Sequence, residues 1–126
     1  MSFNVHNGFS RDGRLDLEAI AQVIEASGAD VVGLQEVSRG WLINGSADMV
    51  QWLSQRLGMA YVYGPTEGAL WGNALLSRLP VLAVRPLDLS LPHREPRGAI
   101  DARQRCCSSW RLAKPVAGLA ATSRPA

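Results

Sequence analysis

The sequence predicts a mixed α/β fold, and two observations lead to this prediction. Apolar residues recur at the spacing of an amphipathic helix in two segments, and shorter apolar runs with the character of strands flank them. The chain has 126 residues, of which 47% are apolar, enough for one modest core. No apolar stretch approaches the roughly 20 residues that a membrane-spanning helix needs, so the chain is expected to be soluble.

The first part of the chain is predicted to run strand, helix, strand. Ser2–His6 alternates like a short strand and is followed by glycine-containing turns. A helix follows between Asp16, a plausible N-cap, and Gly28, a plausible C-terminal stop. Its apolar positions at i, i+3, i+4 and i+7 are Leu17, Ile20, Ala21 and Ile24. Asp30–Val37 is a continuous apolar run that ends in polar residues, which is typical of a strand buried on both faces.

The second helical segment is Ser46–Leu57. It places Met49, Leu53 and Leu57 on one stripe, and Gly58 is expected to end it. Ala60–Tyr63 follows and has the residue types of a strand.

Two further strands are predicted to form a pair. They are Trp71–Ser77 and Val81–Arg85, with residues 78–80 as the turn between them. The proline-rich segment Pro86–Pro96 is expected to be a loop, and Arg97–Ala102 to start one more strand.

The regular pattern ends near Arg103, so we predict a domain over residues 1–103 and a tail over residues 104–126. The tail is rich in Arg, Ala, Ser and Pro and has no periodicity, which indicates either disorder or translation out of frame. The residues up to Ile100 carry a net charge of −2, whereas those after it carry +4. All the net basicity therefore lies in the tail, and the main segment gives no argument for a DNA-binding surface. The only cysteines, Cys106 and Cys107, are adjacent, which suits neither a disulfide framework nor a zinc site.

Three short segments contain polar residues in or next to predicted strands. Asn4 lies in Phe-Asn-Val-His-Asn-Gly, Glu36 in Asp-Val-Val-Gly-Leu-Gln-Glu-Val, and Asn73 in Trp-Gly-Asn-Ala-Leu-Leu-Ser-Arg-Leu-Pro. In this order and spacing they resemble three successive motifs of the endonuclease/exonuclease/phosphatase (DNase I-like) family, over about Ser2 to Ala102. The segment Ser38-Arg-Gly-Trp-Leu-Ile-Asn-Gly-Ser-Ala-Asp-Met-Val-Gln-Trp-Leu more specifically resembles the hydrolase-like domain of a subgroup linked to remodelling of lipid (GPI) anchors.

The resemblance implies both a fold and a chemistry. The fold would be part of a four-layer DNase I-like β-sandwich flanked by helices, with its site at one end of the paired sheets. The chemistry would be hydrolysis of a phosphoester with Mg²⁺ as cofactor. Glu36 would be the metal ligand and Asn4 its companion, while Asn73 would act as a catalytic residue that contacts phosphate or orients the site. Carboxylate and amide oxygens are the ligand types that Mg²⁺ prefers.

The motifs that carry the family's remaining catalytic residues do not occur in this sequence. There is no Thr-His-Leu, no Gly-Asp-x-Asn and no terminal Ser-Asp-His, and neither His6 nor His93 lies in such a motif. The chain is therefore expected to be a C-terminally truncated part of the domain and inactive by itself. The alternative is a non-catalytic fragment or binding remnant. The substrate stays open between nucleic acid, phospholipid and lipid-linked phosphate, and so does the location, cytoplasmic or membrane-associated through a region upstream of Met1.

Other candidate residues have simpler structural explanations. Trp41, Trp52 and Trp71 are predicted to be core or interface anchors, although Trp71 could line a substrate cleft. Arg94 and Arg97 flank the proline-rich loop and could meet phosphate, but solvated charges on a loop are the more common case.

Overall fold

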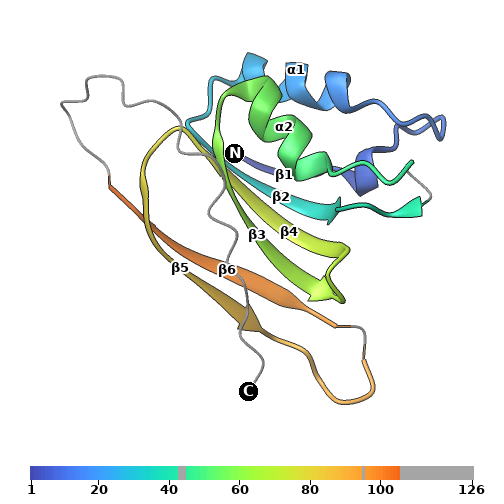
Figure 1. Ribbon diagram of the computed structural model, residues 1–126, viewed down its shortest axis with the longest axis vertical. Helices are drawn as coiled ribbons and strands as arrows, with labels where there is room; N and C mark the ends of the chain where they lie inside the picture. Colours follow the sequence, from blue (N-terminus) through green and yellow to red (C-terminus); the bar gives the residue numbers. More distant parts are fainter. Residues whose placement is uncertain (43–44, 95, 106–126) are drawn as a thin grey trace.

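The computed structural model describes residues 1–42, 45–94 and 96–105 and has three layers (Figure 1). Two helices cover one face of a four-stranded sheet, and a two-stranded hairpin lies against its other face. The helices are α1 (Leu17–Ser27) and α2 (Met49–Leu57), and a short 3-10 turn, η1, spans His6–Gly8. The strands are β1 (Ser2–Asn4), β2 (Val31–Ser38), β3 (Ala60–Glu67), β4 (Trp71–Ser77), β5 (Val81–Asp88) and β6 (Gly98–Gln104).

The first sheet has the strand order β1-β2-β4-β3, in which β1 runs parallel to β2 and the other pairs are antiparallel. The second sheet is the antiparallel hairpin β5-β6. The predicted pairing of Trp71–Ser77 with Val81–Arg85 is therefore wrong. Instead, the side chain of Ser77 bonds both the amide and the carbonyl of Leu79, and this tight turn takes the chain out of the first sheet. Sequence patterns identified both strands, but strand partners depend on non-local hydrogen bonds.

The predicted ends of the helices rest on local chemistry, and most of them are confirmed. Asp16 caps α1 by accepting a hydrogen bond from the amide of Ala19 at 2.8 Å, and Gly28 ends it in the left-handed conformation. The second helix begins at Met49 and not at Ser46, because Asp48 is its N-cap and accepts from the amide of Gln51 at 3.0 Å.

The core lies between the helices and the first sheet. It contains the apolar faces of α1 and α2, the residues of β2 and β4 that point toward them, and two residues outside these elements, Val5 and Met59. Its other buried residues are Ile20, Ala21, Ile24, Val32, Leu34, Val37, Met49, Val50, Leu53, Leu57, Ala74 and Leu76. In β2 the burial alternates along most of the strand, so the prediction of a strand buried on both faces holds only in part. Above this core, Arg56 of α2 pairs with Glu18 and Glu25 of α1 at 2.7 and 2.9 Å.

The two sheets meet where side chains are small. A Cβ added to Gly64 of β3 would lie 2.6 Å from Cγ1 of Ile100 on β6, so the absence of a side chain lets the second sheet approach. Within the first sheet, a Cβ on Gly72 would collide with the carbonyl oxygen of Gly64 on the neighbouring strand. Both glycines are needed for close approach rather than for an unusual backbone angle.

Several strand boundaries extend beyond their predicted limits. The strand predicted over Ala60–Tyr63 runs to Glu67, and β5 continues through Pro86 to Asp88, which shortens the predicted loop. At the end of β6, Gln104 still pairs with Val81, whereas the rest of the predicted tail, from Cys106, lies outside the described residues. Within the part of the chain that the structure describes, no helix is long and apolar enough to cross a membrane.

Candidate metal and phosphate site

The three residues singled out from the sequence lie on neighbouring strands at one level of the first sheet. Asn4, the last residue of β1, pairs with Gln35 of β2. Between the pairs formed by Leu34 and Val37, a β-bulge leaves Gln35 and Glu36 opposite the single residue Asn73 of β4. The register thus gathers residues that are far apart in sequence at the carboxyl ends of β1 and β2.

The bulge places Glu36 in an unusual backbone conformation. Its φ is +55°, in the left-handed region that non-glycine residues rarely adopt. Such a conformation costs on the order of 1 to 3 kcal/mol, and strained residues of this kind cluster at functional sites. Its carboxylate is 39% exposed, so it is accessible to solvent.

His6 contacts both predicted metal ligands, which the sequence did not reveal. Its Nδ1 lies 3.1 Å from Oε2 of Glu36, and its backbone amide donates to Oδ1 of Asn4 at 3.0 Å. Like Glu36, His6 has a positive φ, of 45°. The position of a histidine two residues after Asn4 was visible in the sequence, but the fold alone shows that it faces Glu36.

Asn73 is held by the second sheet. Its Nδ2 donates to the carbonyl oxygen of Gly98 at the start of β6, at 2.9 Å. Among the described residues no hydrogen bond joins Asn73 to Asn4 or Glu36. The side chain therefore links the layers at the level of the site, and its predicted contact with phosphate stays a prediction.

The donor atoms fit part of a Mg²⁺ shell. Asn4 and Glu36 offer an amide and a carboxylate oxygen, the hard ligands that Mg²⁺ takes while keeping several waters. In residues 1–42, 45–94 and 96–105, no group of three or more His, Cys, Asp or Glu side chains could hold a metal ion. A cation held by Asn4 and Glu36 would take its remaining ligands from water or substrate oxygens.

A cationic and aromatic cluster adjoins the end of β2. Arg39 binds Oδ2 of Asp48 through Nε and one terminal nitrogen, at 2.8 and 2.6 Å, and its guanidinium lies 5.1 Å from the ring centre of Tyr63. The hydrogen bond to Asp48 raises the pKa of Arg39. Burial raises the pKa of Tyr63 to about 12, and its hydroxyl has no hydrogen-bond partner.

The tryptophans fall into two groups. The rings of Trp41 and Trp71 lie 5.4 Å apart, and both side chains are partly buried, as expected of anchors. Trp52 on α2 is 37% exposed.

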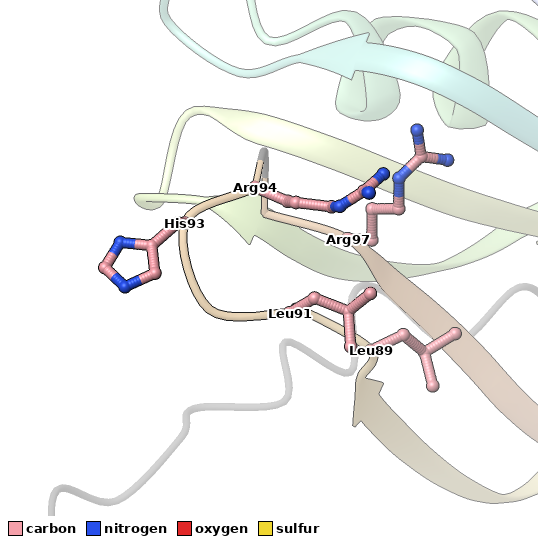
Figure 2. A pocket seen from close by; sticks show the side chains of 5 residues that line it. All are labelled: Leu89, Leu91, His93, Arg94 and Arg97. Atoms are coloured by element: carbon pink, nitrogen blue, oxygen red, sulfur yellow. The ribbon is translucent and has the colours of Figure 1, made fainter.

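A second candidate feature is the loop between β5 and β6. Leu89, Leu91, His93, Arg94 and Arg97 line a pocket of about 480 Å³ there (Figure 2). The loop connects β5 to β6. Gly98, the first residue of β6, accepts the hydrogen bond from Asn73. The loop therefore leaves the second sheet at the end where Asn4 and Glu36 lie.

Comparisons with known proteins agree with the fold described above. A family model described as the PGAP2IP C-terminal nuclease-like domain matches residues 1–109. The crystal structure of an endonuclease/exonuclease/phosphatase from Beutenbergia cavernae is similar, with a TM-score of 0.60 and 25% sequence identity over 80% of this chain. The match covers 32% of that protein, so the chain spans about a third of its length.

Proposed function

Because the chain belongs to the family of the PGAP2IP C-terminal nuclease-like domain, within the endonuclease/exonuclease/phosphatase fold, we propose that Asn4 and Glu36 bind Mg²⁺ for phosphoester hydrolysis. The observation that carries the proposal is the bulge that turns Glu36 into a left-handed conformation beside Asn4 and His6. Strain of this kind persists only where the surrounding structure enforces it.

Each residue has a role that its contacts support. Glu36 supplies the negative charge that attracts the cation, and Asn4 supplies an amide oxygen fixed by the amide of His6. His6 holds the carboxylate of Glu36 in place through Nδ1. Asn73 keeps β6 against this end of the sheet and orients the site. When bound, Mg²⁺ would polarise the phosphate and offset its developing charge.

A second candidate, a domain that binds but does not catalyse, is favoured by one observation. Among the described residues, no histidine is paired with an aspartate that could help it activate water. Binding of the cation and turnover of a phosphoester must therefore be measured separately.

The first test is cation binding to the full chain and to two variants. Mn²⁺ serves as a paramagnetic probe and Mg²⁺ as its competitor. We expect Glu36→Gln to weaken Mn²⁺ binding by at least about tenfold, since loss of even a supporting residue costs this much in metal sites. Asp30→Asn is the control, because it removes an exposed carboxylate at the opposite end of β2. Equal Mn²⁺ binding by the wild type and Glu36→Gln would refute the assignment.

The second test is hydrolysis of bis-p-nitrophenyl phosphate with Mg²⁺ by the same three proteins. Turnover that is present in the wild type and Asp30→Asn but lost in Glu36→Gln supports the hydrolase. If cation binding depends on Glu36 while no protein turns over the ester, the chain is the binding domain of the second candidate.

A further inference from the structure

The loop between β5 and β6 joins β6 at the end of the sheets where the candidate metal site lies. Asn73, opposite Glu36, bonds Gly98, and Arg97 is the next residue along the chain. Strands within a sheet are about 4.8 Å apart and stacked sheets about 10 Å, so the backbone of Arg97 is on the order of 15 Å from Glu36. An arginine side chain can span a large part of that distance.

The loop presents two kinds of side chain to solvent. Leu89 and Leu91 are 55% and 62% exposed. Arg94 and Arg97 extend their guanidinium groups toward the same side of the loop, whereas His93 points away from them (Figure 2). An apolar pair beside a cationic pair suits a ligand that has both an anionic and an apolar part.

Backbone hydrogen bonds hold this arrangement. The amide of Leu89 donates to the carbonyl of Arg97 at 2.9 Å, and the amide of Arg94 donates to the carbonyl of Leu91 at 3.2 Å. Among the described residues, neither guanidinium has a side-chain partner, whereas Arg85 of β5 pairs with Asp101. Including Glu95, which lies outside the described residues, the segment 89–97 keeps a net charge of +1.

We propose that this loop binds a phospholipid, with Arg94 and Arg97 on its phosphate and Leu89 and Leu91 against its acyl chains. Guanidinium groups match phosphate oxygens in geometry and charge. The loop has no Phe, Tyr or Trp side chain on which a nucleic-acid base could stack, and its one imidazole, that of His93, points away from the two arginines (Figure 2). The inference rests on the proposed function only in that the bound phosphate would lie toward Glu36.

The test is co-sedimentation of the full chain with vesicles in EDTA. Vesicles of phosphatidylcholine alone are compared with vesicles that also contain phosphatidic acid. We expect Arg94→Gln/Arg97→Gln to lower the affinity for the anionic vesicles about thirtyfold, since each basic residue near an anionic bilayer contributes on the order of fivefold. Leu89→Ser/Leu91→Ser should weaken binding to both kinds of vesicle.

Two controls make the outcome specific. Arg78→Gln/Arg103→Gln removes the same charge from exposed arginines at the far ends of β4 and β6 and should bind like the wild type. The second control is the EDTA itself: it removes divalent cations, so a failure of the metal assignment leaves this test intact.

Three results would overturn the proposal. One is that the wild type does not bind the anionic vesicles, or binds them no better than the Arg94/Arg97 variant. Another is equal loss in the Arg78/Arg103 control, which would indicate general charge attraction. A single-stranded oligonucleotide that displaces the vesicles and depends on the same arginines, with no effect of the leucine variant, would assign the loop to nucleic acid.

Discussion

At the scale of single residues, the candidate site combines backbone strain with solvent access. His6 and Glu36 both have positive φ angles, and their side chains face each other at 3.1 Å with 71% and 39% exposure. A purely structural contact would gain little at such exposure, because exposed ion pairs contribute at most about 1 kcal/mol. The strain of two left-handed residues is of similar or larger size. The proposed binding role would account for this strain.

Tyr63 allows a prediction about stability at high pH. Burial raises its pKa to about 12, while an unfolded tyrosine titrates near 10. Between these values the unfolded chain loses a proton that the folded chain keeps, so the free energy of unfolding falls as pH rises through this range. Tyr63→Phe should reduce that fall.

Urea unfolding at pH 8 and pH 11 checks the prediction, with Tyr61→Phe as the control on the same strand. At pH 8, Tyr63→Phe should change stability by less than about 1 kcal/mol, because the hydroxyl that it removes is buried without a partner. A loss above about 2 kcal/mol at pH 8, or an unchanged dependence on pH, would contradict the prediction.

At the scale of secondary-structure elements, the N-terminus of α2 has two functions in one side chain. Asp48 caps the helix through Oδ1 and binds Arg39 through Oδ2. It thereby ties the end of β2, the strand that presents Glu36, to the start of α2. Asp16 caps α1 in the same way, and no ion pair to it is found in the described part of the chain.

Replacing these two caps should have unequal effects. Asp16→Ala should lower the free energy of unfolding by about 1 kcal/mol, the usual value of a cap. Asp48→Ala should lower it by about 3 kcal/mol, because it also leaves the partly buried Arg39 without its partner. Asp48→Asn keeps the cap, so its loss in free energy of unfolding should lie between those of the two alanine variants. Equal losses for the two alanine variants, measured by urea unfolding, would show that the ion pair contributes nothing.

At the scale of the whole molecule, the second sheet depends on the first. A two-stranded hairpin is marginally stable in water, and β5 is largely exposed, with Leu82 52% accessible. The contacts of Gly64 with Ile100 and of Asn73 with Gly98 therefore help to hold the second sheet, and with it the loop of Arg94 and Arg97, against the first.

The sheet interface can be tested by a double-mutant cycle. Gly64→Ala should destabilise the chain by about 2 kcal/mol, because its Cβ would press on the side chain of Ile100. Ile100→Ala should relieve this pressure, so the double variant should be at least about 1 kcal/mol more stable than the sum of the single effects predicts. Gly33→Ala on β2 is the control, since its nearest neighbour would be 3.8 Å away. Strict additivity would show that the sheets do not pack at Gly64.

The sequence by itself determined those features that rest on neighbouring residues. Asp16, Gly28 and Gly58 marked helix ends, because caps and left-handed stops act within one helical turn. The segments around Asn4, Glu36 and Asn73 indicated the family, because their residue types and their order can be read directly from the sequence.

Only the tertiary structure decided how these parts meet. It placed β4 between β2 and β3 and gave β5 to a second sheet, through hydrogen bonds between segments distant in sequence. It also turned Glu36 into a left-handed bulge facing His6, since that conformation follows from the mismatch in register between β2 and β4. Local propensity opposes such a conformation, so no pattern in the sequence could have predicted it.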